Sequence, residues 1–361
     1  MITAKNRRSI KKIAVVTTTI HTPTLLSAYV LDRQTDSSSP LGQVELDIIV
    51  SGDVSTPPEA REYVEKLGGT YLGVDDAATT RWKTHRQVGT YSIQRRNIAT
   101  LHALAIGADV IITVDDDNEP HYRYLHRIID EFQPGMRRLL SAPDGLWNPG
   151  SLLTPPTWQR GFPLDRRRDS LNFTSESKWL DNVGVVQGLT TGDPDVDAVE
   201  RIVNNPTCDT IVVDENVVLD YGLWAPFNTQ NTAITRELAP LLQCMVHVGR
   251  YDDILASYIA RAVMDVARWR VSYGHPLTHS VRNEHNLVKD LEQELLGYKI
   301  LPKFITRLRE ADITADAPIL DQYVDAFDVV SGLLSMHTSE ATDAWITDVE
   351  TALEEGDSDW T

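Results

Sequence analysis

The sequence predicts an α/β fold built on a mixed, mainly parallel sheet flanked by helices, with a helical extension at its C-terminal end. Three observations predict it. Strand patterns alternate with helix patterns over the first 120 residues, one buried-strand pattern ends on three consecutive aspartates, and helix patterns return from residue 252 onward. Strands that are separated by helices favour parallel pairing, with both faces of the sheet covered.

The N-terminal elements follow from apolar runs and their stop signals. Residues 12–19 (KIAVVTTT) and 45–50 (ELDIIV) have the composition of buried strands. Residues 57–68 begin with Pro and end on Gly, which is typical of a helix start and stop. Residues 92–107 place apolar side chains on one helical face, and 109–114 (DVIITV) predict the next strand.

The later part of the chain divides into a loop-rich middle and a helical end. Residues 140–250 combine Pro, Gly and Trp with short strand-like runs such as VGVVQGL and TIVVDENVVL. Residues 252–269 carry apolar side chains at helical spacing, and amphipathic helices continue to about residue 354. We therefore predict a catalytic domain over 1–300 and a helical extension over 301–361, which packs on that domain or forms a subunit contact.

Composition excludes several classes of partner. The formal net charge of −18 argues against nucleic acid or an anionic membrane surface, because both demand a basic footprint. No apolar run is long enough to cross a bilayer. Two cysteines suggest neither a disulfide framework nor a metal knuckle, so we expect a cytoplasmic protein.

The three aspartates at 115–117 are the first candidate site. In an extended chain Asp115 and Asp117 point the same way and Asp116 points oppositely. Two carboxylates that converge at the carboxyl edge of a sheet repel each other, and partial burial strengthens the repulsion. A divalent cation removes the problem, and hard oxygen ligands suit Mg²⁺ or Mn²⁺.

Two other interpretations start from the same residues. The aspartates could be solvated residues of a strand-to-helix loop, with one of them capping the helix predicted over 121–132. An aspartyl-phosphatase site also begins with Asp-x-Asp after a strand. Here Asn118, Glu119 and Pro120 follow, and the motif is not on the first strand, which disfavours that reading.

At this point the chain resembles a known family. Its motifs are similar, in order, to those of GT-A glycosyltransferases, and in particular to the reversibly glycosylated polypeptide, or UDP-arabinopyranose mutase, family. The resemblance runs from about residue 12 to 300. The stretches that carry it are SIQRRNIATLHALAIGAD (92–109), VDDDNEP (114–120), RGFPLDRR (160–167), VVQGLTTGDPDVDA (185–198), GRYDDILASYIAR (249–261) and HSVRNEHNLVKDLEQE (279–294).

The resemblance implies a GT-A fold and a cation site that also holds the nucleotide. It assigns Asp115, Asp116 and Asp117 to that site, with Asp117 as the direct metal ligand. His279 follows a strand-like run where such enzymes often place a further metal ligand, and neutral imidazole suits that role. A lone histidine is also commonly structural, so both roles stay open.

Two further groups of acids fall in the matched motifs. Asp252 and Asp253 begin a predicted helix, where one Asp is expected simply as an N-cap. The resemblance implies that the other acts at the sugar, as a base or by stabilising positive charge at the anomeric carbon, and we prefer Asp253. Asp195, in the Gly-Asp-Pro loop, is either a partner of sugar hydroxyls or a turn residue, as are Asp193 and Asp197.

The arginines have open roles. The resemblance implies that Arg160 is tied to reversible self-glycosylation, whereas a forked guanidinium gripping a diphosphate is chemically easier. Arg167 is expected to bind phosphate. Arg95, or its neighbour Arg96, could reach the nucleotide, and we expect one of the two to be solvated. Thr17 and Thr19, at the end of the first strand, would lie near the uracil.

These residues together predict a metal-dependent enzyme that uses a UDP-sugar. The first hypothesis is a UDP-sugar mutase of the arabinose type that interconverts pyranose and furanose rings and glycosylates itself on Arg. The second is a glycosyltransferase that moves the sugar to a separate acceptor. The third is a non-catalytic subunit that binds nucleotide sugar. The expected cofactor is Mn²⁺ or Mg²⁺, the expected partner is a UDP-sugar, and a homo-oligomer is possible.

Overall fold

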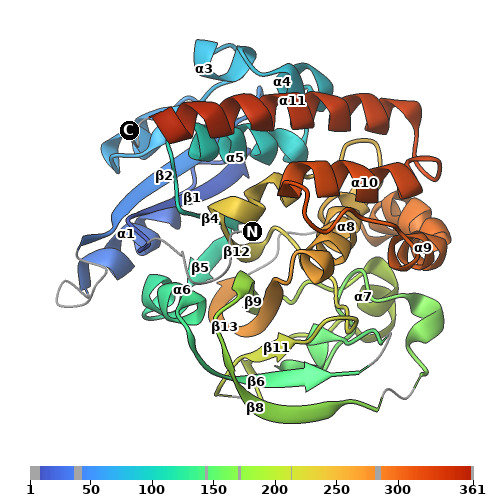
Figure 1. Ribbon diagram of the computed structural model, residues 1–361. Helices are drawn as coiled ribbons and strands as arrows, with labels where there is room; N and C mark the ends of the chain where they lie inside the picture. Colours follow the sequence, from blue (N-terminus) through green and yellow to red (C-terminus); the bar gives the residue numbers. More distant parts are fainter. Residues whose placement is uncertain are drawn as a thin grey trace.

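The computed structural model describes residues 9–35, 43–142, 145–169, 172–212, 214–280 and 286–358. Within these ranges an 11-stranded sheet runs through the molecule in the order β3-β2-β1-β4-β12-β9-β13-β11-β6-β8, and β5 pairs with β13 (Figure 1). Its strands are β1 (Lys12–Thr19), β2 (Glu45–Gly52), β3 (Thr70–Leu72), β4 (Val110–Val114), β5 (Asn118–Pro120), β6 (Gly135–Ser141), β8 (Thr174–Leu180), β9 (Val183–Gly192), β11 (Val217–Leu219), β12 (Asn231–Thr235) and β13 (Arg270–Ser280). A small second sheet pairs β7 (Leu153–Thr154) with β10 (Thr210–Ile211).

The strand directions confirm the predicted fold class. The first four strands of the order pair in parallel, so that Val15 of β1 lies between Ile48 of β2 and Ile112 of β4. β12 is antiparallel to both β4 and β9, and β9 is parallel to β13. Most strands run in the direction of β1, and β5, β6, β11 and β12 run against it. The sheet is therefore mixed and mainly parallel.

Helices cover both faces of the sheet. Alternating side chains of β1 show the two cores, because Ile13 packs with α1, α2 and α6 on one face while Ala14 packs with α5 and α8 on the other. The α-helices are α1 (Leu26–Thr35), α2 (Glu59–Lys66), α3 (Ala77–Thr80), α4 (Lys83–Val88), α5 (Arg96–Ala105), α6 (Tyr124–Phe132), α7 (Ala198–Asn204), α8 (Asp252–Val266), α9 (Leu287–Arg309), α10 (Ile319–Ser331) and α11 (Met336–Ser358). Short 3₁₀ helices are η3 (Ile93–Arg95), η4 (Pro149–Leu152), η5 (Leu164–Arg166), η6 (Arg236–Leu241) and η7 (Gly249–Tyr251).

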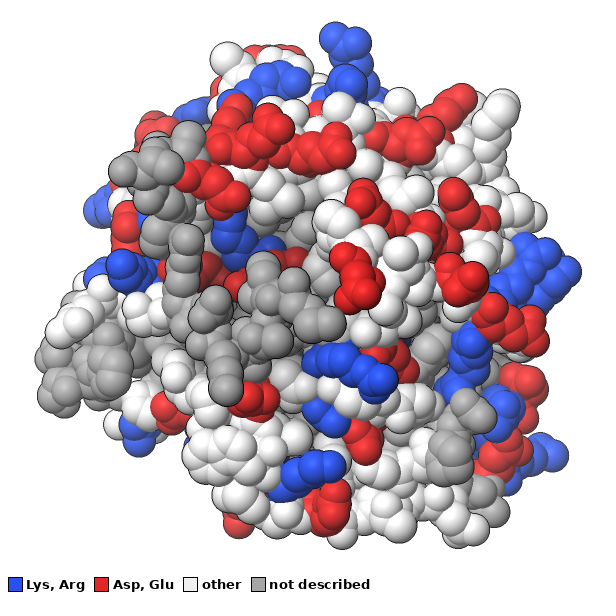
Figure 2. All heavy atoms as spheres, in the orientation of Figure 1, with Lys and Arg blue, Asp and Glu red and all other residues white. Residues whose placement is uncertain are grey.

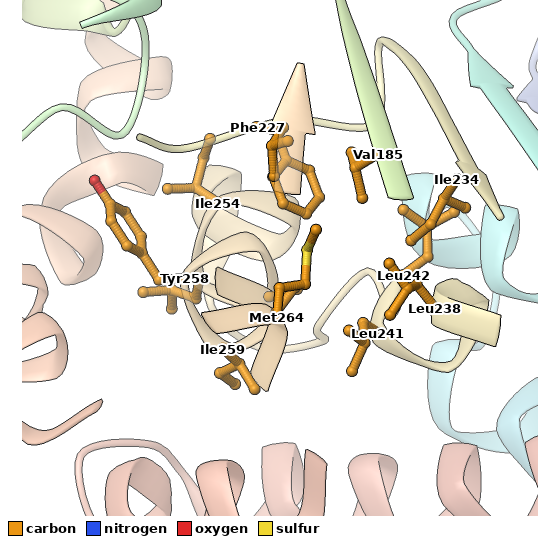
Figure 3. Packing of buried hydrophobic residues seen from close by; sticks show 14 of the residues in the cluster. Val185, Phe227, Ile234, Leu238, Leu241, Leu242, Ile254, Tyr258, Ile259 and Met264 are labelled. Carbon is orange, nitrogen blue, oxygen red and sulfur yellow. The ribbon is translucent and has the colours of Figure 1, made fainter. Parts of the chain in front are cut away.

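Helix α8 is fixed by a dense apolar core beneath it. Figure 3 shows Ile254 and Met264 of α8 beside Phe227, with Ile234 of β12 on the far side of the same cluster. All four side chains are buried. This packing holds α8 so that its first residues lie at the edge of the sheet where β4 and β9 end.

The C-terminal helices share this core. α11 lies across α4 and α5, and α10 packs against α8 (Figure 1). Trp345 of α11 is fully buried and donates its indole N–H to the carbonyl of Pro240 at 3.0 Å. The boundary expected between residues 300 and 301 falls inside α9, and the division into two domains stays a prediction.

The surface reflects the net negative charge. Figure 2 shows acidic side chains gathered over α10 and α11. None of the helices that the structure describes combines the length and the apolar character that a membrane crossing requires.

Candidate functional site

A cavity of about 560 Å³ opens at the edge of the sheet where β4, β9 and β13 end. Ligands of open α/β sheets bind at this edge, beyond the carboxyl ends of the parallel strands. The cavity is strongly acidic, since six of its lining residues are aspartates. The lining comprises Tyr91, Ser92, Ile93, Gln94, Arg96, Asp115, Asp117, Arg160, Asp193, Pro194, Asp195, Thr229, Gln230, His247, Gly249, Arg250, Asp252, Asp253, Ser280 and Gln293.

The three consecutive aspartates form a turn between β4 and β5. Asp115 and Asp117 line the cavity, whereas Asp116 accepts a hydrogen bond from the Thr19 hydroxyl. Arg96 donates one Nη to Asp115 and the other to the carbonyl of Thr229. The structure thus brings Asp115 and Asp117 together and ties Asp116 to the end of β1.

Two carboxylates of this turn, Asp116 and Asp117, are costly to ionise. Burial raises the pKa of the Asp117 carboxyl to about 6, and the charges of Asp115 and Asp116 contribute in the same direction. Burial likewise raises the pKa of Asp116, although the Thr19 hydroxyl opposes this. A divalent cation would favour the charged forms. The hard oxygen donors of Asp115 and Asp117 fit Mg²⁺ or Mn²⁺.

His279, the expected further metal ligand, lies outside the lining of the cavity, and its role as a ligand stays a prediction. It lies exposed on β13, opposite Glu119, with Nδ1 3.3 Å from the Thr191 hydroxyl. Across the described ranges, no three His, Cys, Asp or Glu side chains converge closely enough to hold a metal ion.

Arg160 is the centre of a buried clamp. Its Nε donates to Asp195 Oδ1 at 2.8 Å, and one Nη donates to Asp195 Oδ2 and Asp253 Oδ2, both at 3.2 Å. The other Nη donates to Asp253 Oδ1 at 2.9 Å and to the carbonyl of Arg250. A guanidinium has five N–H donors, so all of them are engaged. In this conformation Arg160 has no nitrogen left to receive a sugar or to grip a phosphate.

The pKa values of the two aspartates at the start of α8 are shifted in opposite directions. Burial alone would raise the pKa of Asp253, but the Arg160 guanidinium outweighs it and holds the pKa below its usual range. Asp253 also accepts hydrogen bonds from the Thr229 backbone N–H at 3.0 Å and the Thr229 hydroxyl at 3.3 Å.

Asp252 is the more basic of the pair. Burial and the charge of Asp253 raise the pKa of Asp252 to about 6, although its side chain accepts a hydrogen bond from Gln94 Nε2 at 2.9 Å. A carboxylate with a pKa near neutrality suits proton transfer better than one held ionised by an arginine. As a base, Asp252 therefore fits better than Asp253, whereas a carboxylate held ionised suits the stabilisation of positive charge, and the preference for Asp253 at the sugar stays a prediction. The expected N-cap is wrong, because no side-chain hydrogen bond caps α8 in the described structure.

The last arginine of the RGFPLDRR motif lies outside the cavity lining. Arg167 pairs with Asp197, whose other carboxylate oxygen caps α7 by accepting from the Glu200 N–H at 2.8 Å. Asp193 pairs with Arg201 at the cavity wall. Of these residues, Asp193 alone faces the cavity, and phosphate binding by Arg167 would require its ion pair with Asp197 to open.

The residues expected near the nucleotide are more deeply buried than their motifs suggest. Thr17 is fully buried in β1 and donates its hydroxyl to the carbonyl of Thr18 at 3.2 Å. Arg95 is also fully buried and donates to the carbonyls of Gly52 at 2.5 Å and Gly89 at 3.1 Å. Arg96 is buried too, so the expectation that one of these arginines is solvated is wrong. Arg96, and not Arg95, reaches the cavity.

Several residues that line the cavity were not predicted, because no pattern in the sequence marks them as part of a site. Gln293 comes from α9, and its carbonyl oxygen lies against Gly249 in η7. His247 and Tyr91 line the cavity with left-handed backbones, at φ 61° and φ 56°. Such conformations are uncommon outside Gly and Asn, and they occur often at functional sites. Residues 281–285 (VRNEH) of the HSVRNEHNLVKDLEQE motif lie outside the described residues.

Fold and site together define an α/β protein with an acidic ligand cavity at the carboxyl edge of its sheet, built from two aspartate pairs and a buried arginine clamp. No family model matches the chain. Over 123 residues it is 28% identical to UDP-arabinopyranose mutase 3 of Arabidopsis thaliana. This match covers 32% of the chain and 31% of the relative, so the chain spans about a third of the length of that protein. The family resemblance seen in the motifs is thereby confirmed over part of the chain.

Solved structures show more distant likenesses. Glucosyl-3-phosphoglycerate synthase from Mycobacterium tuberculosis, in complex with Mg²⁺ and UDP, is 12% identical, with a TM-score of 0.34 over 83% of this chain and 78% of that one. Mannosyl-3-phosphoglycerate synthase from Rubrobacter xylanophilus is 12% identical, with a TM-score of 0.38 over 83% of this chain and 74% of that one. At scores this low, neither match adds to the argument.

Proposed function

We propose that this protein is a UDP-sugar-utilising enzyme of the GT-A type, and that its reaction is the ring isomerisation of a UDP-sugar. One observation carries the proposal. A single cavity is lined both by Asp115 and Asp117, at the end of β4, and by Asp252 and Asp253, at the start of α8. The first pair suits a cation-bound diphosphate, and the second suits a sugar whose anomeric bond breaks. The partial match to a UDP-arabinopyranose mutase supports this substrate class.

Asp115 and Asp117 would hold the cation, Mn²⁺ or Mg²⁺, and Arg96 would keep Asp115 in place. When bound, the cation neutralises the negative charge that develops on the departing diphosphate. The protein supplies little other positive charge there, because Arg96 and Arg160 are already bonded to carboxylates within the chain.

Asp253 and Asp252 would carry out the two remaining tasks, which are the stabilisation of positive charge on the sugar and the transfer of a proton. The bond between the anomeric carbon and the β-phosphate oxygen breaks, and its electrons leave with UDP. Asp253, held ionised by Arg160, faces the positive charge that is left on the sugar. The hydroxyl oxygen that becomes the new ring oxygen then bonds to the anomeric carbon, and the bond from that carbon to the old ring oxygen breaks. Asp252 takes the proton from that hydroxyl and returns it to the old ring oxygen, before UDP recaptures the anomeric carbon.

A transfer to a separate acceptor is the second candidate. It is favoured by the state of Arg160, because a guanidinium with five engaged N–H groups accepts no sugar until its bonds to Asp195 and Asp253 break. Self-glycosylation on Arg160 would thus require the clamp to open. The same engagement makes a pyrophosphate grip by Arg160 less favourable.

One experiment separates the candidates. The protein is incubated with a panel of UDP-sugars and Mn²⁺ or Mg²⁺, and both the nucleotide sugars and the intact protein mass are measured. A ring-isomer product supports the mutase, and release of free UDP only after an acceptor is added supports the transferase. A mass increase of one sugar residue, absent in Arg160→Lys, identifies self-glycosylation. Binding without turnover of any UDP-sugar contradicts an enzymatic role.

The cation site has a direct test. Asp117→Asn keeps the shape of the side chain but removes its charge, so metal-dependent binding of UDP should be lost while the fold stays intact. Calorimetric titration with UDP and Mn²⁺ measures the binding, and circular dichroism checks the fold. Asp165→Asn, at an exposed residue of η5, is the control and should bind like the wild type. Unchanged affinity in Asp117→Asn would remove Asp117 from the site.

A further inference from the structure

The last strand of the main sheet leaves an edge uncovered. β8 pairs with β6 on one side, and no strand within the described ranges pairs with its other side. Every residue of β8 except Leu180 is exposed. Trp179 is 63% exposed and lies opposite Met136, which is 55% exposed, and Phe173 just before the strand is exposed as well. An exposed edge with large apolar side chains is a template for pairing with another chain.

The charges of β8 are arranged symmetrically about one residue. Glu176 and Lys178 flank Ser177, and they point to the same face of the strand. If β8 met a second β8 in antiparallel orientation with Ser177 opposite Ser177, Glu176 of each copy would lie opposite Lys178 of the other. Opposite charges in directly facing positions stabilise a strand pair, and like charges destabilise it.

The other face of the same pair would be apolar. In this register Trp179 lies opposite Ser175 of the second copy and diagonal to its Phe173. Diagonal neighbours in an antiparallel pair remain within reach of aromatic side chains. The exposed Trp179, Met136 and Phe173 would then cover one another across the junction.

We propose that two copies of this chain associate through their β8 strands, antiparallel and with a twofold axis at Ser177, so that the two sheets become one. A homodimer of this kind is isologous, and a self-complementary surface is what it requires. Charged residues on a protective edge strand repel a second copy. The order Glu-Ser-Lys instead places opposite charges across from each other when two copies pair. For this reason we prefer a second copy of the chain to an unrelated partner as the occupant of this edge. The cavity lies at β4, β9, β13 and α8 and is not part of this edge.

Charge reversal tests the register. Glu176→Lys or Lys178→Glu each creates two like-charged pairs across the axis, and each should weaken dimerisation about tenfold in sedimentation velocity at low salt. The double variant Glu176→Lys/Lys178→Glu restores opposite charges and should restore the dimer. Glu350→Lys, at an exposed residue of α11, should leave the association unchanged. A wild type that sediments as a monomer at every concentration, or a double variant as weak as the singles, overturns the proposal.

A disulfide tests the axis. Facing residues of an antiparallel pair have Cα atoms roughly 4.5–5.5 Å apart, which a disulfide spans. Ser177→Cys should therefore form a covalent dimer on mild oxidation, and Ser175→Cys, on the same face of the same strand, should not. The natural Cys208 and Cys244 are buried and should not compete. Equal cross-linking of the two variants, or none by Ser177→Cys, contradicts an axis at this residue.

Discussion

Arg160 can organise the site even though all of its guanidinium N–H groups are bonded to the protein itself. Its guanidinium joins Asp195 to Asp253 and donates a forked pair of hydrogen bonds to each carboxylate. Charge-assisted bonds of this kind are about twice as strong as neutral ones. We interpret Arg160 as the residue that fixes the orientation of both acids.

Replacing Arg160 with lysine should weaken this arrangement. A single ammonium keeps the charge but cannot bond both carboxylates in the forked geometry, so we expect a loss of about 2–3 kcal/mol in the free energy of unfolding. Turnover of the UDP-sugar should fall with it. Chemical denaturation and product analysis measure the two effects. Arg166→Lys, at an exposed residue of η5, is the control and should change neither quantity. Wild-type stability with complete loss of turnover would instead favour Arg160 as the sugar acceptor.

The adjacent aspartates of α8 should respond to pH in opposite ways. Asp252 has a pKa of about 6 in the folded protein, above its ordinary value, so the folded state binds its proton more tightly than the unfolded state does. Its contribution to stability is complete below the ordinary pKa and is lost as the pH rises through about 6. At pH 8, Asp252→Asn should therefore increase the free energy of unfolding, by at most about 3 kcal/mol.

Asp253→Asn is the matched comparison at the next residue. Its pKa is lowered, so the carboxylate contributes stability above its ordinary pKa, and that stability is lost as the pH falls. The substitution should destabilise the protein at pH 8. Denaturant titrations of both variants from pH 4 to pH 8 measure these slopes. Equal effects of the two substitutions would contradict the electrostatic difference between the two side chains.

Sequence singled out Arg160 and the aspartates that line the cavity, but not the contacts among them. The RGFPLDRR motif singled out Arg160, yet Asp195 and Asp253 lie 35 and 93 residues away from it, and no local pattern records such a pairing. The same limit explains the choice between Asp252 and Asp253. Their neighbours Gln94 and Arg160 come from distant segments, and the bonds of Arg160 to Asp253 alone explain why the pKa values of the two carboxyls shift in opposite directions.

At the scale of elements, α9 and η7 form one wall of the cavity. Gly249 has φ +66°, and a Cβ there would lie 2.0 Å from the carbonyl oxygen of Gln293. Any side chain at this position would push α9 away from the cavity. This close approach is the reason that glycine opens the GRYDD segment.

Gly249→Ala should therefore reduce both stability and ligand affinity. Gly68→Ala is a sharp control, because Gly68 has φ +79° but nothing within 4 Å of its Cβ position. We expect Gly68→Ala to cost about 1 kcal/mol of backbone strain and to leave UDP binding unchanged. Gly249→Ala should cost more and weaken the binding of UDP. Thermal unfolding and calorimetric titration compare them, and equal behaviour would show that α9 does not shape the cavity.

Elements with strong periodicity were predictable, and short or polar ones were not. The strands at 12–19 and 45–50 and the helix from 252 follow from apolar patterns, and β1, β2 and α8 match them. β12 (Asn231–Thr235) is fully buried in the centre of the sheet although its sequence, NTAIT, is mostly polar. Its polar groups are satisfied by tertiary contacts such as Thr232 Oγ1 to Gln187 Oε1 at 2.8 Å, which periodicity cannot reveal.

At the scale of the whole molecule, the C-terminal helices stabilise the core that positions α8. Trp345 is fully buried and bonds to Pro240, so Trp345→Ala leaves both a cavity and an unpaired carbonyl. We expect a loss of about 3–5 kcal/mol in the free energy of unfolding, measured by denaturant titration. Glu350→Ala, on the exposed side of the same helix, should be close to neutral. A small effect of Trp345→Ala would show that α11 is an appendage and not part of the core.

The continuity of α9 has a thermodynamic consequence. One end of this helix supplies Gln293 to the cavity, and its remaining length packs on α8 and α10. A molecule that settles against Gln293 favours the state in which α9 is folded, because binding stabilises whatever conformation it requires. Amide exchange would then slow along α9 and in its neighbour α10. Binding in the cavity would thus be detectable in a helix that contributes no residue to the cavity.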